Sequence, residues 1–163
     1  MVIKPMAKNL IEIIKLRTND DYQLNCFFSK LKESGSDKTF HPHPFTREAA
    51  DKICDKDKQI GNDDLYVAIK WENHLIVGYG FLKGFEEGYE IPHLGIAITK
   101  EFRGKGLSKL LMNYLHTSAR MRGCKEIYLK VYKDNEAAVN LYRKLGYELE
   151  ETNDKELAGT IKL

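Results

Sequence analysis

The sequence predicts one mixed α/β domain, and three observations support this fold class. Short β-rich segments alternate with amphipathic helical segments, and the two clearest helices are followed by Gly123 and Gly146. No internal repeat, low-complexity segment or linker interrupts the pattern. With 163 residues, of which 42% are hydrophobic and 31% charged, the chain can bury a single core. We therefore expect one domain over residues 1–163.

The expected strands are segments rich in β-branched and aromatic residues between turn residues. They cover residues 10–17, 65–71, 75–82, 89–99, 127–131, 147–151 and 157–163. Glu72-Asn73-His74 separates the second strand from the third and predicts a hairpin. Pro92 lies near the start of the fourth strand and cannot donate a ladder hydrogen bond, so we expect irregular pairing there.

Four helices are expected where apolar residues recur at helical spacing or a capping residue precedes helix formers. The first runs from Tyr22 to Gly35, the second from Thr46 to about Asp55, the third from Leu107 to Gly123, and the fourth from Asp134 or Asn135 to Gly146.

Charge and cysteine content exclude several classes of protein. A net charge of +2 and a pI of about 8.3 do not require nucleic acid or an anionic membrane as a partner. Cys26, Cys54 and Cys124 are far apart and form no C-x-x-C pair, so we expect neither a disulfide framework nor a zinc site. Reduced thiols indicate a cytoplasmic protein. Charged residues interrupt the apolar stretch near the N-terminus, and we expect no signal peptide and no membrane span.

A glycine-rich turn, Arg103-Gly104-Lys105-Gly106, stands between the fourth strand and the third helix. A helix N-terminus leaves backbone N–H groups unpaired and carries partial positive charge, and glycines let a ligand approach the backbone. Ser108 adds a hydroxyl and Lys109 a positive charge in the first helical turn. The turn predicts a phosphate or pyrophosphate site. The alternative is a tight connection whose basic residues face water.

Two better-known phosphate loops do not fit this spacing. A dinucleotide fingerprint needs a third glycine three residues after the second, where this chain has Lys109. A P-loop needs four residues between its glycines, followed by Lys and Ser or Thr, and neither feature is present.

Two blocks of the sequence resemble the GNAT superfamily of N-acetyltransferases. Ile96-Ala97-Ile98 followed by Arg103-Gly104-Lys105-Gly106-Leu107-Ser108 resembles the acetyl-CoA signature Gln/Arg-x-x-Gly-x-Gly/Ala, although Glu101 stands in its first position. The segment from Asn135 to Tyr147 resembles the family's Asn-x-x-Ala-x-x-Leu-Tyr-x-x-x-Gly-Phe/Tyr block. The order of elements agrees over residues 10–163, and the motifs cover residues 94–147.

The resemblance implies a GNAT fold. This fold has a central mixed, mostly antiparallel twisted sheet of six to seven strands, about four helices, and splayed strands in the middle. It also implies acetyl-CoA as the co-substrate and no metal. The strand before the turn would pair with pantetheine, the turn would hold the pyrophosphate, and Asn135 would bind the pantetheine region. The implied cofactor-binding residues are Ile96, Ala97, Ile98, Arg103, Gly104, Lys105, Gly106, Leu107, Ser108 and Asn135.

Tyr142 is the catalytic residue that the resemblance implies. In the family, a tyrosine at this position protonates the leaving thiolate, and a phenol suits that role because it stays protonated near neutral pH. The alternative is that Tyr142 only packs in the apolar stripe of its helix. A strand N–H such as that of Ile98 could stabilise the tetrahedral oxyanion. Direct attack by the amine needs no covalent enzyme intermediate.

The general base is expected on the fourth strand, where the family often places it. We favour Glu90, with His93 second, and a bulge at Pro92 could exchange the faces they point to. Glu90 could equally be a solvated strand end, and His93 a packed imidazole. Bulk water could also carry the proton away.

The segment His41-Pro42-His43-Pro44 must be extended, because each residue before a proline avoids the α region. Its two histidines lack further ligands nearby, so we do not expect a metal site. A substrate-side loop and a plain connector are both consistent with this sequence.

The family therefore implies an N-acetyltransferase that acts on a primary amine of a small molecule or a peptide. Alternatives are transfer from another acyl-CoA, and a catalytically weak acyl-CoA-binding or regulatory domain. A nucleic-acid-binding module would need a basic face with interleaved aromatics, which is not evident. Dimers are common in the family, so a homodimer stays open. The sequence does not identify the amine.

Overall fold

The computed structural model describes residues 10–55, 64–72 and 75–163. Its centre is a seven-stranded sheet with the order β1-β2-β3-β4-β5-β7-β6. The strands are β1 Ile11–Lys15, β2 Leu65–Trp71, β3 Leu75–Lys83, β4 His93–Ile98, β5 Glu126–Tyr132, β6 Glu148–Glu151 and β7 Glu156–Lys162. All neighbouring strands are antiparallel except β4 and β5, which are parallel. The expected mixed, mostly antiparallel sheet is confirmed.

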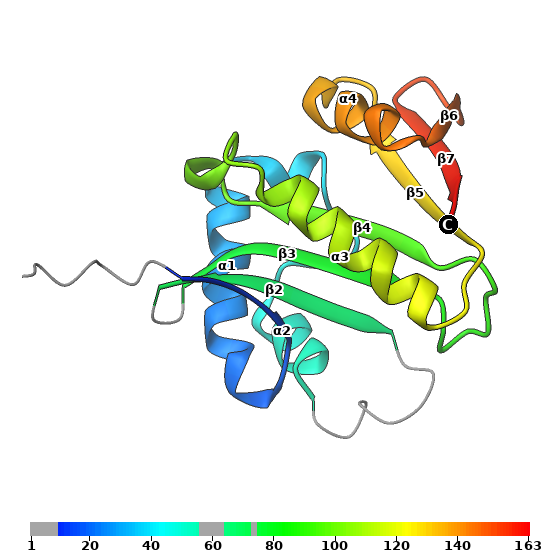
Figure 1. The fold of residues 1–163 in the computed structure, drawn as a ribbon. Coiled ribbons are helices and arrows are strands. Elements are labelled where there is room, and N and C mark those ends of the chain that lie inside the picture. The colour runs from blue at the N-terminus through cyan, green and yellow to red at the C-terminus, as the bar shows by residue number, and fades with distance from the viewer. Residues whose placement is uncertain (1–9, 56–63, 73–74) are drawn as a thin grey trace, which may run out of the picture.

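Four α-helices pack on this sheet within the described residues. They are α1 Asp21–Glu33, α2 Arg47–Ile53, α3 Leu107–Met121 and α4 Glu136–Leu145. Helices α1 and α2 cover one face of β2, β3 and β4, whereas α3 crosses the other face (Figure 1). No helix in the described part of the chain has the length and apolar character needed to cross a membrane.

Local sequence explains where α2 and α4 begin. The Thr46 hydroxyl accepts a hydrogen bond from the Ala49 N–H at 3.2 Å, and the Asn135 side chain accepts one from the Ala138 N–H at 3.3 Å. Gly146 ends α4 in the left-handed region with φ of 100°. Capping and C-terminal glycines therefore place these helices as the sequence predicts.

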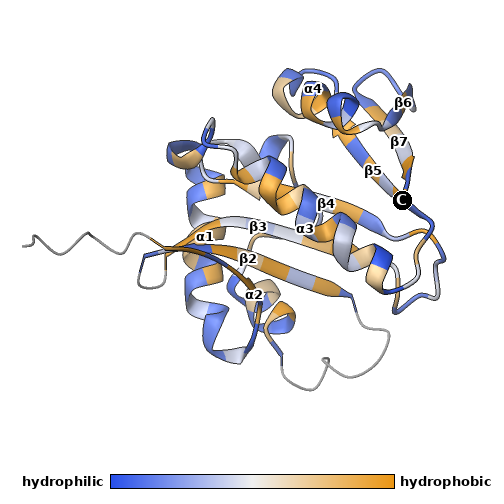
Figure 2. Ribbon diagram, in the orientation of Figure 1, coloured by the Kyte–Doolittle hydropathy of each residue, from blue (hydrophilic) through white to orange (hydrophobic). Residues whose placement is uncertain are grey.

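The core has two layers, one on each face of the sheet. On β3, Tyr79 and Phe81 point toward α1 and α2, whereas Val77 and Leu82 point toward α3. Hydrophobic and hydrophilic residues alternate around α1 and α3, as expected for helices with one buried face (Figure 2). Both faces of β2 and β3 are therefore largely covered.

The sheet opens between β4 and β5. The two strands share one register pair, His93 with Tyr128, and the Tyr128 N–H donates to the Pro92 carbonyl at 3.0 Å. From there β5 diverges from β4 at an angle, and α4, β6 and β7 lie next to β5 (Figure 1). The expected splay in the middle of the sheet is present.

The predicted strand over residues 89–99 is too long at its N-terminal end. Strand β4 begins at His93, and the Tyr89 N–H is held in a turn by the Gly84 carbonyl at 2.8 Å. Pro92 precedes β4 and lies outside its paired residues, and β3 and β4 pair in continuous register from Gly78–Ile98 to Lys83–His93. Proline removes one donor, but it does not shift this register.

The hairpin between β2 and β3 is confirmed by their antiparallel pairing. Residues 73 and 74 of its expected turn lie outside the described residues. The register of this pair shifts between Ile69 and Lys70.

Candidate functional site

A cleft of about 630 Å³ lies at the open side of β4, which we call the first cleft. It is lined by residues 34–36, 39, 40, 96–98, 102–104, 106–109, 130, 131, 134, 135, 137, 138, 141 and 142. The strand edge, the glycine turn and α4 thus contribute to one cavity. Nine of the ten residues expected to bind the cofactor line it; Lys105 is exposed and does not.

The N-terminus of α3 forms one end of the first cleft. Gly106 is its N-cap with φ of 83°, and Gly104 has φ of 73°, a left-handed conformation that favours glycine. In contrast to α2 and α4, no side chain caps α3, and no acidic residue lies in its first turn. Its first N–H groups and partial positive charge are therefore available to an anion in the cleft.

The edge of β4 forms the wall next to this helix end. The Thr99 N–H donates to Val77 of β3 at 3.0 Å. Because successive residues of a strand direct their backbone groups to opposite edges, the N–H groups of Ile96 and Ile98 point toward the gap beside β5. These groups can bind an extended, amide-containing ligand.

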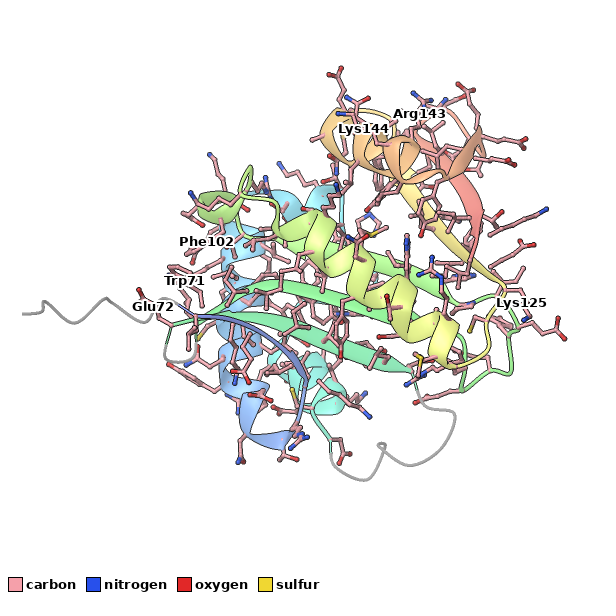
Figure 3. All side chains as sticks on the ribbon, viewed as in Figure 1. Trp71, Glu72, Phe102, Lys125, Arg143 and Lys144 are labelled. Atoms are coloured by element: carbon pink, nitrogen blue, oxygen red, sulfur yellow. The ribbon has the colours of Figure 1, made fainter. Side chains whose placement is uncertain are left out.

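Two side chains hold the N-terminal end of the glycine turn in place. Phe102 packs edge-on against Trp71 with ring centroids 6.1 Å apart, and the two side chains lie together in Figure 3. Arg103 donates from Nε to the Ile98 carbonyl at 3.1 Å and from Nη2 to the Ser36 hydroxyl at 2.7 Å. The Arg103 guanidinium thus joins the turn to the loop after α1, a contact between distant segments that the sequence does not reveal.

Tyr142 lies on the side of α4 that faces the first cleft, whereas Arg143 and Lys144 point outward (Figure 3). Its side chain is only 6% exposed, and its hydroxyl has no hydrogen-bond partner among the described residues. Burial raises the pKa of the Tyr142 phenol far above its usual value, so the group stays protonated. Tyr142 therefore presents a proton donor without a protein acceptor.

Two residues behind Tyr142 fix its position. Its ring packs against Tyr147 with centroids 5.8 Å apart, and the Tyr147 hydroxyl shares a hydrogen bond of 2.8 Å with Nε2 of His116 on α3. This buried pair links α3 to the end of α4. The side chain of Asn135 also has a structural role, because it caps α4 while lining the cleft.

A second cleft of about 320 Å³ adjoins the first and shares Thr39, Phe40, Lys130 and Val131 with it. Its further lining residues are 41, 42, 81, 83, 93–95, 128, 129, 132 and 156. His93 lies here, with its ring 4.6 Å from that of Tyr128. Partial burial, assisted by the charge of Lys130, lowers the pKa of His93 below its usual value of about 6.5. His93 is therefore neutral at neutral pH and can accept a proton.

Glu90 does not lie with His93. It is exposed in the bend before β4 and lines a different surface hollow beside residues 122–126. The preference for Glu90 as base rested on an extended strand that the structure replaces with a turn. Of the two candidate bases, only His93 lines either of the clefts that adjoin the glycine turn.

The two histidines of the loop from His41 to Pro44 lie in different surroundings. His41 Nε2 shares a hydrogen bond of 2.7 Å with the Tyr132 hydroxyl, and His41 lines the second cleft. His43 is turned toward the core, where Nε2 lies 2.9 Å from the Tyr79 hydroxyl. The described residues contain no group of three or more His, Cys, Asp or Glu that could hold a metal ion.

Comparison with known families now decides the classification. The family model described as the acetyltransferase (GNAT) family matches residues 29–147, which include both clefts except the part formed by Glu156. The chain belongs to the GNAT family of acetyltransferases. An acetyltransferase of Pectobacterium atrosepticum is 28% identical over 99 residues, which cover 60% of this chain and 68% of that protein.

Solved GNAT structures share the whole fold. A GNAT acetyltransferase from Streptococcus pneumoniae superposes with a TM-score of 0.75 at 18% identity, covering 94% of this chain and 100% of that chain. The PaiA N-acetyltransferase of Thermoplasma acidophilum, solved with coenzyme A, gives a TM-score of 0.76 at 18% identity, covering 94% and 99%. The topology and the open sheet are thus those of GNAT proteins.

Proposed function

We propose that this protein transfers an acetyl group from acetyl-CoA to a primary amine of a small molecule or a peptide. The observation that carries the proposal is the buried hydroxyl of Tyr142, which has no hydrogen-bond partner in the described part of the chain. It lines the same cleft as the N-terminus of α3, which no described side chain caps. A binding domain without turnover would need only the anion site, whereas a proton donor in the same cleft suits a leaving thiolate.

The chain's residues fit acetyl-CoA along the length of the first cleft. The N–H groups at the start of α3 and the glycine turn would hold the pyrophosphate. The N–H groups of Ile96 and Ile98 would pair with pantetheine and place the thioester near Tyr142. A solved GNAT relative binds coenzyme A, which supports this assignment. Acetyl-CoA supplies a thioester whose carbonyl carbon is the electrophile.

Proton transfers at the amine and at the thiolate accompany the reaction. His93 accepts a proton from the ammonium group of the acceptor, which leaves a neutral amine to attack the thioester carbon. As the C–N bond forms, a β4 backbone N–H such as that of Ile98 stabilises the oxyanion. When the C–S bond breaks, Tyr142 donates its proton to the thiolate, and the new amide nitrogen loses its second proton to solvent. Tyr142 then regains a proton from solvent, and His93 releases its own.

A coupled assay tests this function. Purified protein is incubated with acetyl-CoA and a panel of primary amines, free thiol is measured with time, and N-acetylated products are identified by mass spectrometry. We expect amine-dependent thiol release. Thermal stability should rise with acetyl-CoA and not with acetate, by linkage to the folded state. If saturating acetyl-CoA does not stabilise the protein, the cofactor assignment is wrong. If it stabilises the protein but no amine is acetylated, the chain is a binding domain.

A further inference from the structure

Two lysines flank His93 on the same face of the sheet. Lys83 of β3 is the register partner of His93, and Tyr128 of β5 is its partner on the other side. Lys130 follows Tyr128 by two residues and so points to the same face. Both ammonium groups act on His93, since the charges of Lys130 and Lys83 help to lower its pKa. The second cleft therefore has a cation on each side of its candidate base.

Neither lysine forms an ion pair in the described part of the chain. The Lys83 ammonium lies 4.7 Å from the centre of the Phe81 ring and 3.4 Å from the Pro42 carbonyl oxygen. Lys130 is exposed and makes no salt bridge within the described ranges.

Nearby carboxylates only partly offset these charges. Glu156 lines the second cleft, but its carboxylate accepts a hydrogen bond from Asn153 at 2.9 Å. Asp64 and Glu87 act on Lys83 from a distance, and Asp64 Oδ1 already accepts the N–H groups of Gly84 and Phe85. The pKa of Lys83 is nevertheless lowered, so burial affects this pKa more than the two carboxylates do.

We infer that the acceptor amine carries an anionic group, a carboxylate or a phosphate, which Lys83 and Lys130 bind at the mouth of the second cleft. This inference rests on the proposed acetyl transfer and specifies its acceptor. An anion would supply the ion-pair partner that both lysines lack among the described residues, and the pair would orient the amine toward His93. An acceptor with several ammonium groups would instead be repelled. Acidic amines should therefore be acetylated, and polyamines should be poor acceptors.

The size and walls of the second cleft agree with a small acceptor or the end of a chain. Its volume of about 320 Å³ is at the lower end of the range for small-molecule sites. Aromatic side chains of Phe40, Phe81, Tyr128 and Tyr132 line it and can pack against the apolar part of the acceptor.

Acceptors that differ mainly in the charge of one end group test this inference. Each set has one carbon chain ending in an amine and, at the other end, a carboxylate, a carboxamide or a second amine. One set is 3-aminopropanoate, 3-aminopropanamide and 1,3-diaminopropane; the second is built on six carbons. Phosphoethanolamine against ethanolamine separates phosphate from carboxylate. Assays at pH 8.5 keep His93 neutral. We expect kcat/KM for the anionic member to exceed that of the neutral member at least tenfold in one series, with the diamine lowest.

Lysine variants test the assignment. In the Lys83→Gln, Lys130→Gln double variant the preference for the anion should fall below threefold. Lys32→Gln, on the exposed side of α1, removes the same kind of charge outside the clefts and should retain the preference. Thermal melts confirm that each variant is folded. Equal rates for anionic, neutral and cationic acceptors overturn the inference, and so does a preference that survives in the double variant.

Product binding tests the inference without a measurement of turnover. N-acetyl-3-aminopropanoate and its amide are titrated into the protein saturated with coenzyme A, by calorimetry. Tighter binding of the acid in wild type than in the double variant supports the inference; equal or absent binding of the two contradicts it. Failure of acetyl-CoA to bind would instead refute the proposed function, so the two failures are distinguishable.

Discussion

His93 and Tyr128 form the register pair at which β4 and β5 part, and their rings lie 4.6 Å apart. From this point the two strands diverge and leave room for both clefts. The residue at this junction is also the candidate base of the proposed reaction. Its chemistry can therefore be tested through the pH dependence of turnover.

The decrease of kcat/KM at low pH, its acid limb, should reflect the protonation of His93. Because the pKa of His93 is lowered, the imidazole stays neutral at pH values below 6.5. Activity should therefore begin to fall only below that pH. Lys130→Gln removes a positive charge that lowers this pKa, so the decrease in kcat/KM should move to higher pH.

His93→Gln should lower kcat/KM by about 10²-fold and abolish the limb. Glu90→Gln is the control, because Glu90 lies outside both clefts and should leave the profile unchanged. An acid limb that is the same in His93→Gln and wild type would show that water, not His93, takes the proton.

Tyr142 and Tyr147 pack together, but substitutions at the two positions should affect turnover and stability differently. The Tyr142 hydroxyl has no hydrogen-bond partner among the described residues, so Tyr142→Phe should lower kcat about 10²-fold or more with little change in unfolding free energy or acetyl-CoA affinity. Tyr147→Phe loses the hydrogen bond to His116 and should cost about 1 kcal/mol of stability.

Denaturant unfolding and single-turnover kinetics of both variants make the comparison. Single turnover ensures that chemistry, rather than product release, is measured. A Tyr142→Phe enzyme with the wild-type chemical rate would remove the general-acid role from this residue.

Two glycines at opposite ends of α3 provide a matched pair. Gly106 and Gly123 both have φ of 83° with no atom within 4 Å of an added Cβ. Alanine at either position should destabilise the fold by about 1–2 kcal/mol, because the left-handed conformation is unfavourable for a residue with a Cβ. Only Gly106 lines the first cleft, so Gly106→Ala alone should weaken acetyl-CoA binding. Equal affinities of the two variants, measured by calorimetry, would argue against a pyrophosphate site at this helix end.

Stability should fall as the pH is lowered through about 6.5. Burial lowers the pKa values of His43 and His116 in the folded state, so these groups remain neutral when the unfolded chain takes up protons. The unfolded state then binds more protons, and folding loses free energy at up to about 1.4 kcal/mol per pH unit for one histidine.

His116→Gln should flatten this slope below about pH 6.5. Chemical denaturation at a series of pH values provides the measurement. A slope that is identical in His116→Gln and wild type would show that other groups dominate the titration.

The sequence by itself determined the features that depend on near neighbours in the chain. Helical spacing, the capping Asn135 and the C-terminal glycines located α3 and α4, and the glycine turn with its block of motif residues indicated the family. Nine of the ten residues expected to bind the cofactor line the first cleft, and all nine come from one strand–turn–helix unit and the next helix cap.

Only the tertiary structure decided how distant segments meet. It placed His93, and not Glu90, beside the clefts, because the strand begins after Pro92 and its register with β3 and β5 is set by long-range pairing. The contact of Arg103 with Ser36 and the placement of Lys83 and Lys130 beside His93 depend on the same pairing. Register across strands is fixed by the burial of whole faces, which no local stretch of sequence encodes.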